Sequence, residues 1–138
     1  MKKLSDGQLE QLREMAKRYD LKGWHFHKDS RGFVIITREG IERIAAHLKI
    51  RVKFTPVHEW CNPTEKQYVI QAEAWCGAGD DQIYGQSYGE VSGSNNKNAY
   101  PVAMAEKRAL SRVVLKMAGM YELGVYGEDE MPTETAAK

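Results

Sequence analysis

The feature that most constrains the fold is a helical segment of about twenty residues, AYPVAMAEKRALSRVVLKMAG at 99–119. Asn98 is a suitable N-cap, Pro101 is tolerated in a first turn, and Gly119 is typical of a helix end. On a helical wheel the apolar side chains fall in one arc, which needs an apolar surface to cover it. That arc comprises Val102, Ala103, Ala109, Leu110, Val113, Val114 and Met117. The helix is therefore expected to pack on a sheet.

Three strand candidates precede this helix and supply the sheet. They are residues 51–57, 67–76 and 82–91, and Pro56 marks the first as an edge strand or a bulge. The glycines and aspartates of 77–81 predict a hairpin between the second and third strands. The third strand alternates small residues with tyrosines and other polar residues. Its small face permits the close approach of a helix.

Two further helices are predicted upstream of the strands. Ser5 and Asp6 can cap a helix that runs to about Tyr19, and Thr37 can cap a second helix over 38–48. The order predicts an α+β fold with a three-stranded antiparallel sheet packed by one long helix (β-β-β-α) and two helices before it.

Chain length and composition narrow the protein class. A chain of 138 residues fits one domain, which we place at 1–126, with an acidic flexible tail over 127–138. No apolar run approaches the ~18–20 residues of a membrane span, and no apolar stretch follows the basic start as in a secretory signal. Two cysteines are too few for a disulfide scaffold. We therefore expect a cytoplasmic protein with no membrane partner.

Charge alternates in blocks along the chain, although the net charge is only +1. Residues 1–60 carry +5, 61–96 carry −4, 97–118 carry +4 and 119–138 carry −4. A polyanionic partner can therefore be inferred only from local clusters.

The sharpest local cluster is a cationic stripe on the long helix, formed by Arg108, Arg112 and Lys116 at i, i+4 and i+8. Like charges at this spacing repel one another, and the helix offers no acidic residue at the same spacing. The stripe favours phosphate binding, and the alternative is a solvated face neutralised by the acidic tail. Glu106 falls inside the apolar arc, so we expect it to form a structural ion pair.

Two metal-dependent alternatives are weaker. A zinc site is disfavoured because its candidate ligands include no CxxC pair and no HxxxH helix. A metal-dependent nuclease site is disfavoured because two of its candidate carboxylates lie in a glycine-rich turn, which is too mobile to position catalytic ligands. The zinc candidates are His25, His27, His58, Cys61 and Cys76, and the nuclease candidates are Glu73, Asp80, Asp81 and Glu90. No phosphate-cradling loop, nucleophile elbow or dinucleotide fingerprint is present. We expect no enzymatic activity, no cofactor and no metal.

Two segments resemble a known family. Residues 88–130, YGEVSGSNNKNAYPVAMAEKRALSRVVLKMAGMYELGVYGEDE, combine a strand ending in small residues, a polar loop and a helix reading A-E-K-R-A-x-x-R-x-x-x-K. Residues 33–54, FVIITREGIERIAAHLKIRVKF, are similar to a helix leading into a first long strand. Together they resemble the single-strand annealing proteins with the Rad-fifty-two fold, which occur in phages, mobile elements and eukaryotes.

The resemblance implies a non-catalytic protein that binds single-stranded DNA and anneals it in homologous recombination or DNA repair. It implies a homo-oligomeric ring or filament and no cofactor. By position it assigns phosphate contacts to the helix and, more weakly, to the upstream helix, the first strand and the polar loop. These residues are Lys107, Arg108, Arg112 and Lys116, then Arg43, Arg51, Lys53 and Lys97. Few basic residues lie in the middle strands, which departs from a fully basic groove.

Tyr84, Tyr88 and Tyr100 can add base stacking, although packing on a sheet explains them equally well. Two other function classes remain open: a small metal-dependent nuclease of the same mobile element, and a protein-interaction domain. Incubation with labelled single strands and magnesium distinguishes them, because an annealing protein shifts the strands uncut, a nuclease cuts them and an interaction domain does neither.

Overall fold

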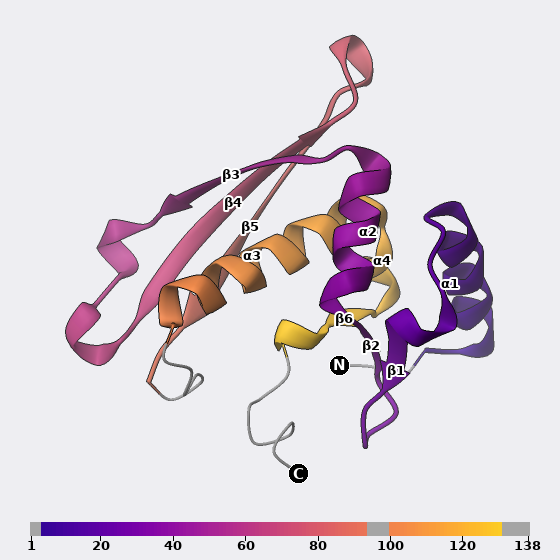
Figure 1. The fold of residues 1–138 in the computed structure, drawn as a ribbon, viewed down its shortest axis with the longest axis horizontal. Coiled ribbons are helices and arrows are strands. Elements are labelled where there is room, and N and C mark those ends of the chain that lie inside the picture. Colours follow the sequence, from indigo (N-terminus) through magenta and orange to yellow (C-terminus); the bar gives the residue numbers. More distant parts are fainter. Residues whose placement is uncertain (1–3, 94–99, 131–138) are drawn as a thin grey trace.

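The computed structural model describes residues 4–93 and 100–130 of the chain, which form a mixed α+β fold (Figure 1). The helices are α1 (Asp6–Arg18), α2 (Arg38–Leu48), α3 (Pro101–Ala118) and α4 (Met120–Leu123). The strands are β1 (Phe26–Lys28), β2 (Val34–Ile36), β3 (Arg51–Pro56), β4 (Tyr68–Cys76), β5 (Ile83–Val91) and β6 (Tyr126–Gly127). The predicted α+β class is confirmed.

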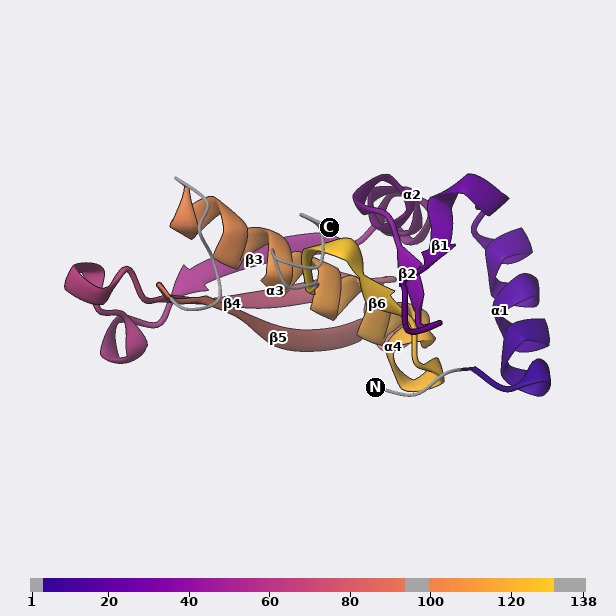
Figure 2. The ribbon, with the colours of Figure 1, turned by 90° about the horizontal axis from the view of Figure 1, so that it is seen from below.

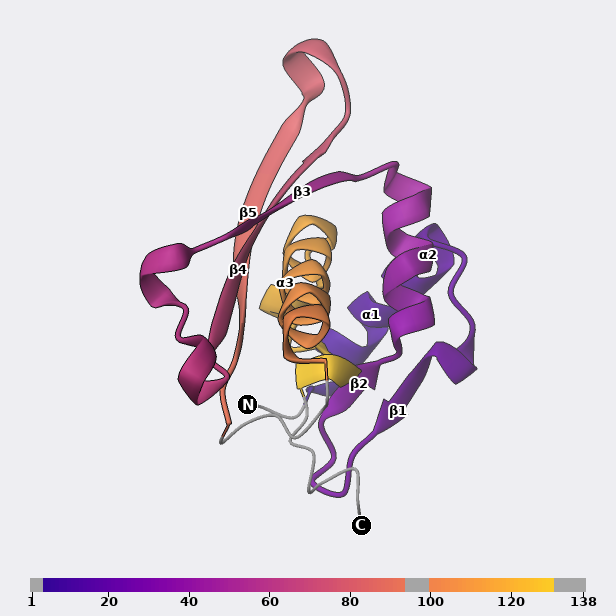
Figure 3. The ribbon, with the colours of Figure 1, turned by 60° about the vertical axis from the view of Figure 1, so that its left-hand side comes forward.

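The larger sheet has the order β3-β4-β5 with antiparallel pairing throughout. Its register places Lys53 opposite Glu73 and Glu73 opposite Gln86. Figure 2 shows α1 at the end of the molecule away from this sheet, and Figure 3 shows α3 on one face of the sheet with α2 on the far side of α3. The predicted β-β-β-α arrangement is thus matched in part, because a second sheet and a fourth helix accompany it.

Local capping explains where the first two helices begin. The Ser5 hydroxyl accepts a hydrogen bond from the Gln8 amide at 3.2 Å, and the Gln8 side chain accepts one from the Ser5 amide at 2.8 Å. The Thr37 hydroxyl accepts from the Gly40 amide at 3.1 Å. Both predicted N-caps are confirmed, whereas Asn98, the predicted cap of the long helix, lies outside the described residues.

The second sheet, β1-β2-β6, was not predicted. β1 pairs antiparallel with β2, and β2 pairs parallel with β6, where Ile36 lies opposite Gly127. The expected flexible tail from residue 127 is therefore wrong for 127–130: Gly127 is buried in the sheet, and the 3-10 helix Glu128–Glu130 packs against α3. Residues 131–138 lie outside the described part of the chain.

The long helix is buried on more than one side, which corrects the predicted wheel. Ala105, Val113 and Leu115 are fully buried, whereas Val102, which was predicted to pack, is exposed. Glu106, which was predicted to form an ion pair, is also exposed and pairs with no basic side chain of the described residues. Figure 1 shows α3 lying obliquely across the strands, so the side of the helix that is covered changes along its length. No helix in the described residues is long and apolar enough to cross a membrane.

Close contact between α3 and β5 depends on a glycine. A Cβ atom at Gly89 would overlap the carbonyl oxygen of Ala105 and the amide nitrogen of Ala109. Both of these are backbone atoms of α3, so no side-chain rotation could relieve the overlap. The prediction that the small face of this strand admits a helix is confirmed.

We predict that Gly89→Ala lowers the free energy of unfolding by about 3 kcal/mol or more, because the helix must move off the sheet. Urea denaturation measures the loss. Gly23→Ala is the matched control: a Cβ there meets nothing within 4 Å, so its effect should stay within about 0.5 kcal/mol. Equal midpoints for the two variants would contradict the tight contact.

Candidate nucleic-acid interface

The cationic stripe Arg108, Arg112 and Lys116 lies along the outer edge of β5, where the described residues provide no further strand. Nη1 of Arg108 donates to the carbonyl oxygen of Glu90 at 2.8 Å. Nη1 of Arg112 donates to the carbonyl of Tyr88 at 2.7 Å, and Nζ of Lys116 lies 3.5 Å from the carbonyl of Gln86. Each cation therefore meets one outward carbonyl of the edge strand.

This match follows from helix and strand dimensions. Four residues of an α-helix rise about 6 Å, and two residues of a β-strand span about 6.8 Å. An i, i+4, i+8 row of donors on α3 therefore stays in step with every second carbonyl of an antiparallel β5. The stripe covers acceptors that would otherwise be open to pairing with another strand.

Arg112 is also neutralised by two carboxylates. Its guanidinium donates to both oxygens of Glu90, at 2.7 and 3.0 Å, and its Nη2 donates to Glu130 at 2.8 Å while its Nε donates to the other oxygen of Glu130. Burial lowers the pKa of Arg112, but the hydrogen bonds that it donates to Glu130 and Glu90 outweigh burial and raise that pKa. The side chain is held as a fixed cation in a largely covered site.

Arg108 is still less accessible, at 7% exposed. Its Nε donates to the backbone carbonyl of Asp129 at 3.0 Å, and burial lowers its pKa despite the nearby carboxylate of Glu130. The carboxylate of Asp129 accepts from the hydroxyl of Ser111 at 3.1 Å, and burial raises the pKa of Asp129. The sequence allowed two interpretations of the stripe, a phosphate-binding surface or a solvated face neutralised by the acidic tail. Neither describes the two arginines fully, because both are largely covered: Arg108 donates to backbone carbonyls of β5 and Asp129, and Arg112 pairs with Glu90 and Glu130.

The other predicted contacts are scattered. Lys116 is exposed near the ring of Tyr121, and Lys107 is half-buried on α3. Arg43 is exposed on α2 and donates to the backbone carbonyl and the carboxylate of Asp20, both at 3.1 Å. Lys97 lies outside the described residues. Only Arg51 and Lys53 lie together, exposed on β3.

Arg51 and Lys53 belong to the face of the larger sheet opposite α3, which we call the open face. Alternate residues of the three strands point to it, and no α-helix of the described chain covers it (Figure 3). The pairing aligns Arg51 with Trp75 and Trp75 with Tyr84, and the next row joins Lys53, Glu73 and Gln86. Arg51 thus adjoins an aromatic side chain on β4, whereas Lys53 lies opposite the carboxylate of Glu73, beyond which Gln86 follows on β5.

Two aromatic pairs lie on the open face. Trp75 and Tyr84 have ring centroids 5.5 Å apart, and Trp60 and Tyr88 have centroids 5.7 Å apart. Trp60 is 52% exposed and Tyr84 is 48% exposed. Because Tyr84 and Tyr88 are four residues apart on one strand, their backbones are separated by about 13 Å. The sequence drew attention to the tyrosines but not to the tryptophans.

Hydrogen bonds fix the side chains of the open face. The Tyr84 hydroxyl donates to Glu73 at 2.8 Å, and this bond raises the pKa of the tyrosine, which stays neutral. Gln71 donates to Gln86 at 3.0 Å. Within the described chain, Arg51 and Lys53 form no ion pair. Their charges are available to an anion.

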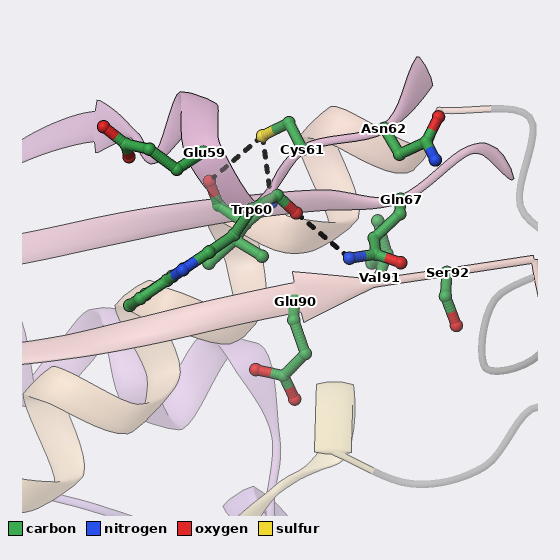
Figure 4. Close-up of a pocket in the computed structure, with 9 residues that line it drawn as sticks. Glu59, Trp60, Cys61, Asn62, Gln67, Glu90, Val91 and Ser92 are labelled. Atoms are coloured by element: carbon green, nitrogen blue, oxygen red, sulfur yellow. Dashed lines mark hydrogen bonds between the residues drawn. The ribbon is translucent and has the colours of Figure 1, made fainter. Parts of the chain in front are cut away.

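An open cleft of about 620 Å³ ends this face beside Trp60 (Figure 4). Trp60, Cys61 and Gln67 line one side, and Glu90 and Ser92 line the other. The Gln67 amide donates to the Trp60 carbonyl at 3.1 Å, and the Cys61 thiol contacts the backbone of Val69. These contacts hold the short 3-10 helix His58–Trp60 over the sheet and thereby fix the position of Trp60.

The residues weighed above as candidate metal ligands do not converge. Within residues 4–93 and 100–130, no group of three or more histidine, cysteine, aspartate or glutamate side chains is placed to hold an ion. Asp80 and Asp81 lie at the tip of the β4–β5 hairpin, away from Glu90 at the other end of β5.

Comparisons with known proteins found no match among family models, curated proteins or solved structures. The candidate interface is therefore defined by geometry and by the sequence resemblance alone.

We predict that Arg112→Ala lowers the free energy of unfolding by about 3 kcal/mol, because it leaves two carboxylates without their shared partner. Urea denaturation at neutral pH measures this loss. Lys116→Ala, at the exposed end of the same stripe, should change stability by no more than about 0.5 kcal/mol. If Arg112→Ala unfolded at the wild-type midpoint, the stripe would not be structural.

Proposed function

We propose that this protein binds single-stranded DNA on the open face of the β3-β4-β5 sheet and promotes annealing of complementary strands, without catalysis. One observation carries the proposal: two aromatic pairs, each with one exposed ring, lie beside a cationic edge strand, and the backbones of their β5 members Tyr84 and Tyr88 are about 13 Å apart. This proposal moves the predicted contacts from Arg108 and Arg112 to Arg51 and Lys53.

The chemistry of the open face favours single strands. Aromatic side chains stack on unpaired bases at about 1–3 kcal/mol per base and with little sequence preference. Bases stacked inside a duplex do not offer their faces to a protein surface, so duplex DNA gains only the phosphate contacts. Arg51 and Lys53 supply those contacts at one edge, and the cleft beside Trp60 leaves room for a planar group at the other end.

Annealing requires that the protein bind single-stranded bases while leaving their base-pairing edges accessible to a complementary strand. A flat, open surface with two stacking positions meets that requirement better than an enclosed pocket does, because bound bases keep their pairing edges free. The resemblance to single-strand annealing proteins points the same way, as does the β-β-β-α order of β3 to α3. A role in recombination or repair in a phage or mobile element is part of this proposal.

We predict that Arg51→Ala with Lys53→Ala lowers the log–log salt slope of oligothymidine binding by about 1.4, at ~0.7 per lost phosphate contact. Trp60→Ala or Tyr84→Ala should weaken binding about tenfold or more while leaving that slope unchanged. Fluorescence anisotropy over a salt series measures both effects. Trp24→Ala and the pair Arg13→Ala with Arg18→Ala are matched controls on exposed residues outside the open face.

Three outcomes would count against the proposal. Controls that lose as much affinity as the open-face variants would show that the surface is misassigned. Cutting of labelled strands in the presence of magnesium would favour a nuclease. Absence of any binding to single strands would favour a protein-interaction domain.

A further inference from the structure

An apolar groove with a cationic rim lies between α1 and the small sheet. It encloses about 480 Å³, and its floor includes Leu12, Leu21 and Phe26. All charged side chains that line it are basic. Of these, Lys17 and Lys28 are exposed and form no ion pair with any described residue. The groove is thus suited to an apolar side chain flanked by carboxylates.

The tip of the β4–β5 hairpin has the complementary character. α3 ends at Ala118 and the hairpin continues past it, so Ile83 is left 56% exposed on the side that the helix covers elsewhere. The turn Gly79–Asp81 places Asp80 and Asp81 beside it, both exposed and without an ion pair among the described residues. No lysine or arginine occurs from residue 67 to 96, so the hairpin has no cation of its own.

In this conformation the hairpin tip cannot reach the groove of its own chain. Figures 1 and 3 both show the tip projecting away from α1 and from the small sheet. The hairpin tip of a second copy of the chain can reach this groove.

We propose that the groove binds the hairpin tip of a second copy, with Ile83 on the apolar floor and Asp80 and Asp81 against Lys17 and Lys28. The charge complementarity of two surfaces within one chain carries this assignment. A net charge of +1 leaves little overall repulsion between copies. The proposal does not depend on nucleic-acid binding.

Such a contact is heterologous, because groove and tip are different surfaces. Each copy then uses its tip on one neighbour and its groove on the other, which generates a closed ring or an open filament rather than an isolated pair. The contact thereby gives a physical basis to the expected homo-oligomer.

Reversing the charges of the hairpin tip or of the groove tests this contact between copies in the absence of DNA. The tip variant is Asp80→Lys with Asp81→Lys, and the groove variant is Lys17→Glu with Lys28→Glu. Each variant alone carries like charges on both surfaces and should lose association more than tenfold, sedimenting as a 15.7 kDa monomer. Mixed in equal amounts they should assemble again, because each tip then meets an oppositely charged groove. Sedimentation velocity at high micromolar concentration measures all three samples and the wild type.

Matched controls reverse the same number of charges elsewhere. Glu39→Lys with Glu106→Lys equals the tip variant in charge, and Lys49→Glu with Lys66→Glu equals the groove variant. Both controls should assemble as the wild type does, and circular dichroism verifies the fold of every variant. The proposal is overturned if the wild type is monomeric, if either variant alone assembles normally, or if the mixture stays monomeric.

Discussion

The contact between α3 and β5 is the interaction on which the rest of the structure depends. Gly89 lets the helix backbone approach the strand, and the cationic stripe then reaches successive carbonyls along the strand edge. Arg112 extends this contact to a third element, because its guanidinium joins Glu90 of β5 to Glu130 beyond β6. Sheet, helix and C-terminal segment are thereby held by one row of donors.

That contact also decides which surface is free for a ligand. The inner face of the larger sheet is covered by α3, and the edge of β5 is covered by the stripe. Two arginines that would otherwise be the strongest phosphate ligands are used within the fold. What remains is the open face, where Arg51 and Lys53 border the rings of Trp75 and Tyr84. Binding by stacking suits a surface with few cations, and it is consistent with the small net charge of the chain.

The sequence predicts elements whose signals are local. Thr37, Ser5 and Gly119 mark helix ends through contacts within a few residues, and the glycine-rich turn of 77–81 marks the hairpin. β6 has only two residues, and it pairs with β2 from a position some ninety residues later in the sequence. No local pattern identifies such a strand. The second sheet was missed for that reason.

The candidate site was predictable only in part for a related reason. The i, i+4, i+8 spacing of the stripe is correct, but a helical wheel does not show what faces it, and the partners Glu90 and Glu130 lie outside the helix. Trp75 could have been found, since it alternates with the inward residues Ala74 and Cys76 on a predicted strand. Trp60 could not, because the fold of the 3-10 helix His58–Trp60 over the sheet depends on the contacts of Gln67 and Cys61.

The most direct test of the central claim is to map where a single strand touches the protein. Photocrosslinking with an oligonucleotide carrying 5-bromouracil, followed by peptide mass spectrometry, reports side chains that lie against bases. We expect crosslinks on peptides that contain Trp60, Trp75 and Tyr84, all on the open face. Crosslinks confined to peptides of α3, with none on β4, β5 or Trp60, would contradict it.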